Sequence, residues 1–496
     1  MDGNMLRGAP FGDAPSTPSR RESQYKPLHT FDLPKGTEKN YAHQFADMYF
    51  LRLARLRKAV KTKAHDAWDE FELGGDKPAF VQRVLDVRQG ELCWIVGTVY
   101  MEMALKPNVL DDISKEHWIA APPPRETYVS GAQDEMMLED ESGRLRVTGE
   151  SLTSTYVTGC VLAALGTEQA DGTFHVIATQ YADLPRQPRR WERDDAALAL
   201  AKKQTPNRAA PARLAIVSGL HITGADDDEL ALNLLLEYLA GEATGPPTQA
   251  AASTISRLVI AGDSLSHASP ILSRDDFAEK KSKKHAYGYD ASSYNASPAE
   301  RLDELLSDLL PSLPITLLPG ANDPANVALP QQPLHPALFP KSRLYAEPPA
   351  KTNETIHGLD TVTNPWQGDV EGYRVLGTGG QTVADLLKYV DDVNALDVME
   401  MMLRWRCIAP TAPDTLWCYP FQDDDPLLVN DCPHVYFAGC QDQFGKKVIE
   451  GPDGQQVLLI SVPRFRETGQ LVLLDLETSE VELVEIGVVQ PESHVT

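Results

Sequence analysis

The chain has 496 residues, of which 46 are Lys or Arg and 71 are Asp or Glu, so its net charge at pH 7 is −25. This length predicts two to four domains, and this charge argues against a protein that grips nucleic acid over a broad surface, because phosphate binding needs clustered cations. Six cysteines without a CxxC pair argue against a zinc ribbon or a disulfide scaffold, and no apolar run is long enough to predict a membrane span.

The first segment of the chain predicts an arm and then a helix. Residues 1–38 contain five prolines among Gly and Ser, which predicts a disordered N-terminal arm. Apolar residues then recur at three- and four-residue spacing, which predicts an amphipathic helix over Tyr41–Trp68. The basic residues in its second half indicate either a solvated cationic face or a surface for an anionic partner or DNA. They are Arg52, Arg55, Arg57, Lys58, Lys61 and Lys63.

From about residue 90 to 185 the pattern changes to short strands, which favours a small barrel or a sandwich, with an OB-type barrel among the candidates. Residues 39–185 are therefore predicted to form one domain, the helix plus these strands. Residues 186–213 are polar and predict a connector. The expected strands are Cys93–Met103, Asp134–Leu138, Arg144–Thr148, Tyr156–Gly166 and Phe174–Tyr181.

Residues 214–490 predict an α/β domain. Apolar strands are expected at Leu214–Ser218, Leu258–Ala261 and Ile315–Leu318. A helix is expected to run to Leu239, with the acidic residues 226–229 in its first turn. The stretch 274–298 lacks periodicity and predicts a long surface loop. Further strands are expected toward the C-terminus at Val435–Ala438, Val457–Val462, Leu471–Leu476 and Val481–Val488.

Polar residues follow the first three of these strands. His221 follows the first, Asp263 the second and Asp323 the third. Ligands sit at the carboxyl ends of strands in open α/β sheets, and a two-metal hydrolase uses carboxylate and imidazole ligands around a bridging water. This layout resembles the calcineurin-like metallophosphoesterases, whose motifs are D-x-H, G-D-x-x-D, G-N-H-D, a lone His and G-H-x-H.

The first two motifs are only half kept. Gly219 stands where that family has its first ligating Asp, whereas His221 keeps the following His. Asp263 is kept in the second motif, but Ser266 stands in the place of the second Asp.

The remaining motifs have lost the residues that would bind metal or act in catalysis. In the third, Ala321 replaces the ligating Asn and Asn322 the catalytic His, while Asp323 is kept. Gly379 stands for the lone His. Cys440 and Asp442 occupy the two His positions of the last motif. With only His221 and Asp263 left among the ligands, the resemblance implies an inactivated site without metal or cofactor, because a dinuclear centre needs anionic ligands to offset its charge.

An inactivated phosphoesterase that follows a small barrel resembles the B-subunits of replicative DNA polymerases, and most of all their delta branch. The match spans the chain from about Tyr41 to Val488. It rests on Tyr41–Leu56, Gly97–Ile113, Leu138–Gly149, Val157–Gly166, Leu318–Pro340, Val375–Leu387, Thr411–Phe421 and Pro433–Phe444.

The resemblance implies an OB fold packed on an inactive phosphodiesterase domain. It implies a nuclear scaffold that ties the cysteine-rich C-terminal domain of the catalytic subunit to a third subunit in DNA replication and repair synthesis. Contact with DNA is expected to be weak or indirect, and no membrane contact is expected.

Two other functions compete with this one. The first is an active metallophosphoesterase with an atypical metal site. The second is an OB fold that binds single-stranded DNA by itself, which needs aromatic residues interleaved with Lys or Arg on exposed strands. Few cations other than Arg144 and Arg146 lie beside the aromatic residues of the expected barrel.

Two groups of residues are left with alternative interpretations. Aromatic residues of the C-terminal domain are either interface anchors or core, and the acidic run 422–425 either meets a basic partner or is solvated. The aromatic residues are Phe339, Trp366, Trp417, Tyr419 and Phe421.

Overall fold

The computed structural model describes most of the chain. The described ranges are residues 20–21, 23–36, 39–107, 125–131, 134–152, 156–190, 212–224, 229–243, 245–266, 296–346 and 358–487. None of the helices in these ranges combines the length and the hydrophobicity that crossing a bilayer requires. The predicted loop 274–298 lies outside them, except for its last three residues, two of which already belong to a helix.

The larger half of the molecule contains two six-stranded mixed sheets. The order of the first is β1-β12-β13-β14-β16-β15, and that of the second is β11-β10-β9-β8-β17-β18. The strands of the first sheet are β1 (Tyr25–Pro27), β12 (Trp366–Val370), β13 (Tyr373–Thr378), β14 (Val435–Gln441), β15 (Gly445–Glu450) and β16 (Gln456–Pro463). Those of the second are β8 (Arg213–Val217), β9 (Ile255–Ala261), β10 (Ile315–Leu318), β11 (Leu359–Thr361), β17 (Gln470–Asp475) and β18 (Val481–Glu485).

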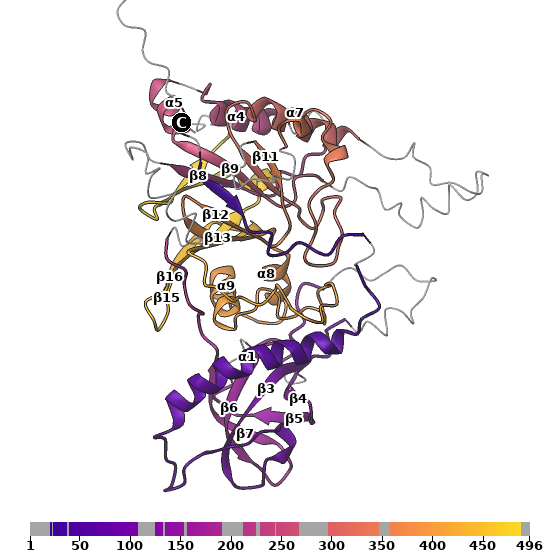
Figure 1. Ribbon diagram of the computed structural model, residues 1–496, viewed down its shortest axis with the longest axis vertical. Coiled ribbons are helices and arrows are strands. Elements are labelled where there is room, and N and C mark those ends of the chain that lie inside the picture. Colours follow the sequence, from indigo (N-terminus) through magenta and orange to yellow (C-terminus); the bar gives the residue numbers. More distant parts are fainter. Residues whose placement is uncertain are drawn as a thin grey trace, which may run out of the picture.

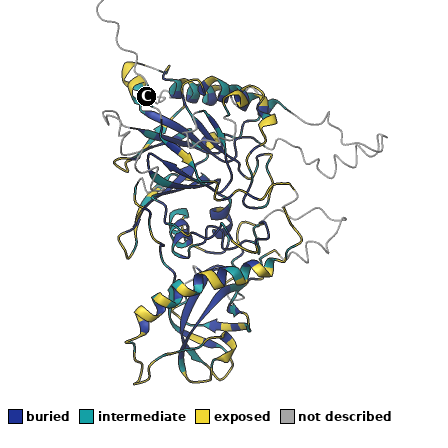
Figure 2. Ribbon diagram, viewed as in Figure 1, coloured by how far each residue is buried: buried dark blue, intermediate teal, exposed yellow. Residues whose placement is uncertain are grey.

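The two sheets enclose one apolar layer and carry helices on their outer faces (Figures 1 and 2). The central parallel strands are buried along nearly their whole length, which explains why they appear in the sequence as uninterrupted apolar runs. Helices α4 (Glu229–Ala240), α5 (Pro246–Ser253) and α7 (Ser297–Leu309) cover the second sheet. Helices α8 (Gln381–Leu386) and α9 (Ala395–Arg404) cover the first, and α10 (Phe465–Thr468) is a single turn after β16.

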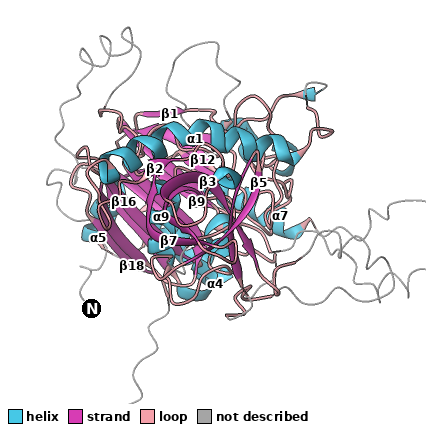
Figure 3. Cartoon of the chain, turned by 90° about the horizontal axis from the view of Figure 1, so that it is seen from below, coloured by secondary structure: helices cyan, strands magenta, loops and turns pink. Residues whose placement is uncertain are grey.

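The smaller half consists of helix α1 and a third sheet. Helix α1 (Phe45–Trp68) lies across the strands, as Figure 3 shows, with its apolar side buried. β3 pairs with both β4 and β6, and β7 joins β5 to β6, so the pairings form a circuit β3-β4-β5-β7-β6-β3. The strands are β2 (Ala79–Phe80), β3 (Leu92–Glu102), β4 (Glu135–Asp140), β5 (Gly143–Thr148), β6 (Val161–Glu168) and β7 (Phe174–Tyr181). The short 3-10 helices are η2 (Val84–Asp86), η5 (Pro336–Leu338) and η6 (Ser342–Tyr345).

Part of the predicted arm 1–38 is ordered, which corrects that prediction. Residues 1–19 lie outside the described ranges, but β1 adds to the edge of the first sheet, with Tyr25 opposite Val370 and Lys26 opposite Asp369. The Tyr25 side chain is 1% exposed, and its ring lies 3.8 Å from the guanidinium of the buried Arg257. Strand pairing with a partner so distant in the sequence leaves no local periodicity, and the prolines conceal the few anchoring side chains.

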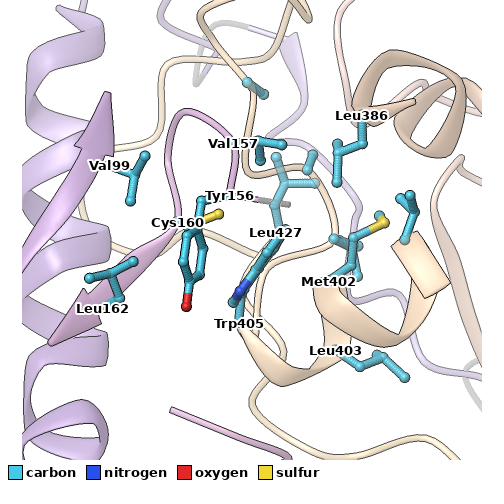
Figure 4. Close-up of a cluster of buried hydrophobic side chains, with 14 of the residues drawn as sticks. Val99, Tyr156, Val157, Cys160, Leu162, Leu386, Met402, Leu403, Trp405 and Leu427 are labelled. Carbon is cyan, nitrogen blue, oxygen red and sulfur yellow. The ribbon is translucent and has the colours of Figure 1, made fainter. Parts of the chain in front are cut away.

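The two halves share a continuous apolar core. Figure 4 shows Tyr156, Val157 and Cys160 of the smaller half facing Met402, Trp405 and others on α9 and the segment after it. The first residues of the expected connector 186–213 are also packed, since the Cys432 N–H donates to the carbonyl of Arg186. Residues 191–211 of that connector lie outside the described ranges.

Candidate functional site

The structure brings the nine candidate positions to one edge of the two sheets. Gly219 and His221 follow β8, Asp263 follows β9, and residues 321–323 follow β10. Gly379 follows β13, whereas Cys440 and Asp442 lie at the end of β14. A backbone hydrogen bond joins the ends of β8 and β9 directly: the Gly219 N–H donates to the carbonyl of Gly262 at 3.0 Å.

The space beside Gly219 is filled by Arg464. A Cβ at Gly219 would lie 3.0 Å from the Cβ and Cγ of Arg464 and 3.1 Å from its Cα. The backbone of Gly219 has φ +59°, a conformation that L side chains rarely adopt. An aspartate at this position would therefore meet both steric crowding and backbone strain.

Asp263 is engaged by a neighbouring amide residue. Its Oδ1 accepts from the backbone N–H of Asn322 at 2.8 Å, and its Oδ2 accepts from the side-chain Nδ2 of Asn322 at 3.0 Å. The His221 N–H donates to the backbone carbonyl of Asp263 at 3.0 Å. Asn322, the replacement for the catalytic His in the resemblance, thus serves as a hydrogen-bond donor to the one kept carboxylate of the second motif.

Asp323 is held inside a cage of backbone amides. Its carboxylate accepts from the N–H groups of Gly320 at 2.8 Å, Leu265 at 2.8 Å and Ser264 at 3.2 Å. Burial raises the pKa of Asp323 to about 7, against the lowering effect of these donors and with a further rise from the charge of Asp263. The side chain therefore ties the loop after β9 to the loop after β10.

An uncharged amide network surrounds Gly379. Its N–H donates to Oδ1 of Asn364 at 2.9 Å, and Nδ2 of Asn364 donates to Oε1 of Gln331 at 2.8 Å and to Oε1 of Gln381 at 2.9 Å. A Cβ at Gly379 would lie 2.9 Å from Nδ2 of Asn364, so a larger residue has no free space there. Ala321, the replacement for the ligating Asn, is exposed and brings no donor atom.

Cys440 and Asp442 lie in different environments, the first partly buried and the second exposed. The Cys440 thiol is half-buried beside Asp263, and burial together with the charges of Asp263 and Asp323 raises its pKa well above the ordinary value. The Asp442 carboxylate is 89% exposed and pairs with Nη1 of Arg464 at 2.5 Å. These two residues do not form a replacement pair of ligands.

The donor set does not fit a dinuclear metal centre. Arg464 fills the space of the first ligand, Asn322 engages Asp263, and Ala321 and Gly379 have no side-chain donor. Within the described ranges, no three His, Cys, Asp or Glu side chains come close enough to share a metal ion. No step of metal chemistry follows from this geometry.

Comparison with known proteins agrees with this architecture. A model of the DNA polymerase alpha/epsilon B-subunit matches residues 214–446, and a model of the DNA polymerase delta subunit OB-fold domain matches residues 44–179. The DNA polymerase delta small subunit of Saccharomyces cerevisiae is 35% identical, covering 91% of both chains. That of Oryza sativa is 36% identical, covering 93% of this chain and 97% of the relative. DNA polymerase delta subunit 2 of Drosophila melanogaster is 32% identical, covering 95% and 99%.

The chain belongs to the DNA polymerase delta small-subunit family. The resemblance inferred from the sequence is thereby confirmed, together with an OB-fold domain in a mixed α/β protein and the assignment to a replicative polymerase. As a member of this family, the chain combines the α1 and β2–β7 domain with the two-sheet domain described above.

Sequence reasoning missed a buried ion pair between the two halves of the molecule. Arg52 of α1, 1% exposed, places Nε 2.6 Å from Oδ2 of the buried Asp425. Arg55 lies 3.5 Å from Asp424 at the surface. Residues 422–424 of the acidic run are exposed, as the solvated interpretation predicts, whereas Asp425 is buried against the basic helix of its own chain, which neither interpretation predicted. Opposite charge on the two segments was the available signal, but nothing local indicated that they would meet.

The aromatic residues divide between core and surface. Trp417 is 62% exposed. The other four are buried, as the core interpretation predicts: Phe339, Trp366, Tyr419 and Phe421.

Proposed function

We propose that the chain is a non-catalytic scaffold subunit of DNA polymerase delta. It would link the cysteine-rich C-terminal domain of the catalytic subunit to a third subunit, in the nucleus, during DNA replication and repair synthesis. Its contact with DNA would be indirect or weak. Membership of the small-subunit family supports the assembly into a polymerase. The finer role is what the family resemblance implies.

One observation carries the non-catalytic part of the proposal: Arg464 fills the space that a ligand side chain at Gly219 needs. The kept carboxylates have structural partners instead, Asn322 for Asp263 and backbone amides for Asp323. We accordingly propose that 214–490 is an inactive calcineurin-like domain, that 39–185 is a helix plus an OB β-barrel, and that 186–213 connects them. The nine positions are then remnants of a former metal site.

The alternative of an active metallophosphoesterase makes a different prediction. It requires bound metal and hydrolysis of a phosphodiester by the purified chain. The geometry disfavours it, because Gly219 offers no ligand and the carboxylate of Asp263 is engaged by the backbone and side-chain N–H groups of Asn322.

The scaffold proposal is tested by mixing the purified chain with the cysteine-rich C-terminal domain of the matching catalytic subunit. Light scattering on a sizing column should give the mass of a one-to-one complex at micromolar concentration. Two separate peaks, with the isolated domain shown to be folded, would contradict the proposed role. A manganese titration and a phosphodiester assay on the same preparation should show no binding and no turnover, and saturable metal binding with hydrolysis would favour the alternative.

A further inference from the structure

A short N-terminal strap joins the two sheets of the larger half of the molecule. The strap consists of Arg20, Arg21 and residues 23–27, and it ends in β1, the indigo strand beside β12 in Figure 1. Nη1 of Arg20 donates to the carbonyl of Ile255 at 3.3 Å, at the start of β9 in the second sheet. Nη2 of Arg21 lies 2.8 Å from Oε2 of Glu371, which follows β12 in the first sheet. The two arginines therefore anchor the strap to one sheet each.

The hydroxyl of Ser23 is enclosed beneath this strap. Ser23 is 3% exposed, and its Oγ accepts from Nε of Arg257 at 3.1 Å. Arg257 is fully buried, and its Nη1 donates to Oγ1 of Thr316 at 2.9 Å. The Tyr25 ring lies against the guanidinium of Arg257, and the Tyr25 hydroxyl donates to Asp360. Ser23 thus occupies a closed site whose neighbours already have partners.

The sequence of the strap also fits the substrates of arginine-directed serine kinases. Arg20 and Arg21 precede Ser23 by three and two residues. Kinases of this class bind an extended segment, in which acidic groups receive arginine side chains at these spacings and the serine hydroxyl reaches the γ-phosphate of ATP. Because the same three side chains anchor the strap, a kinase can engage them only after the strap has left the two sheets.

A phosphate on Ser23 does not fit the closed strap. Phosphorylation adds about two negative charges and three acceptor oxygen atoms at pH 7. Arg257 supplies one positive charge, and the carboxyl group of Asp360 already lies near it. Burying an anion without a matching cation is costly, and a serine that is 3% exposed leaves no volume for the added atoms.

We propose that Ser23 is a phosphorylation site that an arginine-directed serine kinase reaches when the strap detaches, and that the phosphate then keeps the strap off the two sheets. The kinase transfers the γ-phosphoryl group of ATP to Oγ of Ser23, the hydroxyl proton passes to the catalytic aspartate of the kinase, and ADP leaves. Release removes β1 from β12, so the edge of the first sheet loses its cover. The site belongs to this chain alone and does not depend on the scaffold role.

The test follows phosphorylation of the full chain by the catalytic subunit of cAMP-dependent protein kinase, an enzyme of this class, with radiolabelled ATP and peptide mapping of the labelled residue. A synthetic peptide of residues 16–30 gives the rate without a folded strap. The intact chain should be labelled at Ser23 at least about tenfold more slowly than the peptide, because labelling follows the population of opened strap. Tyr25→Ala should bring the rate close to that of the peptide, since it removes the buried anchor of β1.

Three variants separate opening of the strap from other effects. Arg52→Ala is the matched control for lost stability, because it breaks a buried contact with the smaller half of the molecule and should leave labelling slow. Glu371→Gln opens the strap more mildly by removing the ion pair with Arg21, and should raise the rate even if Tyr25→Ala fails to fold. Arg20→Ala/Arg21→Ala in the peptide should abolish labelling, because it removes the side chains that the kinase binds.

Release of the strap is measured by hydrogen exchange on the chain after prolonged phosphorylation. The Glu371 N–H, which donates to the carbonyl of Gln24 at 2.8 Å, should exchange at least about tenfold faster than in the unmodified chain. Unchanged exchange there would overturn the release. Absence of label at Ser23 in the peptide would overturn the site. Equal rates for the intact chain and the peptide, or equal acceleration by Arg52→Ala and Tyr25→Ala, would overturn control by the strap.

Discussion

Replacing Arg52 measures how much its buried contact between the two domains contributes to the free energy of unfolding. Its side chain leaves α1 and enters the two-sheet domain, where Nε lies 2.6 Å from Asp425 and Nη1 donates to the carbonyl of Ala412 at 2.6 Å. Both charged side chains are at most 1% exposed. The substitution Arg52→Ala removes the cation and leaves a buried carboxylate and several carbonyl groups without this donor.

The expected cost follows from that burial. Breaking a buried ion pair by removing one partner destabilises a protein by about 3–5 kcal/mol, because the remaining charge is left without compensation. Asp425 retains only the N–H of Leu427 among the donors described for its carboxylate. We therefore expect Arg52→Ala to lower the free energy of unfolding by about 3–5 kcal/mol.

The measurement is urea unfolding followed by tryptophan fluorescence, with Arg55→Ala as the matched control. Arg55 lies on the same helix, but it is 57% exposed and 3.5 Å from an Asp424 that is 71% exposed. An exposed pair of this kind contributes about 0–1 kcal/mol, so the control should unfold almost as the parent does. If Arg52→Ala also costs less than about 1 kcal/mol, the buried pair does not hold the domains together and the reasoning fails.

Three further outcomes are expected. Gly219→Asp should bind no manganese in a calorimetric titration and should unfold at lower urea concentration, because the new side chain meets Arg464 and a positive φ; metal binding would contradict the steric argument. Tyr25→Ala should cost about 3–5 kcal/mol in the same unfolding assay, since it removes a buried aromatic anchor of β1, and an unchanged midpoint would mean that β1 is not needed. Burial raises the pKa of Asp323 to about 7 in the folded protein, so the folded state binds the proton more tightly than the unfolded state does. The free energy of unfolding therefore contains the full contribution of Asp323 below about pH 4. It loses up to about 4 kcal/mol as the pH rises through about 7. The free energy of unfolding of Asp323→Asn should therefore rise relative to that of the parent between these pH values. Plots of the two free energies against pH that stay parallel would contradict the raised pKa.

The sequence predicted those elements whose signal is local. The buried strands β9 and β10 are unbroken apolar runs, and the seam of α1 repeats with helical period, so both were found within a few residues of their ends. The hairpin of β4 and β5 was visible in its turn residues. Parallel strands of one sheet align their carboxyl ends, so the candidate positions after β8, β9 and β10 were expected at one edge, but the approach of Gly379 and Cys440 from the other sheet depends on how the two sheets pack.

The features that escaped prediction depend on partners far away in the chain. Strand β1 is a short segment among prolines whose order comes from β12, more than three hundred residues later. Arg464 could not be placed beside Gly219 from sequence, since the contact joins the end of β8 to the turn after β16. No spacing rule connects such residues, and only the packed sheets bring them together.

The pairing of Arg52 with Asp425 also changes how the surface is interpreted. In the sequence, the basic helix and the acidic run were each interpreted either as solvated or as a contact with another molecule, but one charge of each, Arg52 and Asp425, is buried in a contact between the two segments. Charges that a chain satisfies internally are no guide to its partners. Aromatic side chains that stay exposed are a better guide to the surfaces that contact partners. Phe50 and Trp417 are exposed although apolar cores lie close to them in the fold.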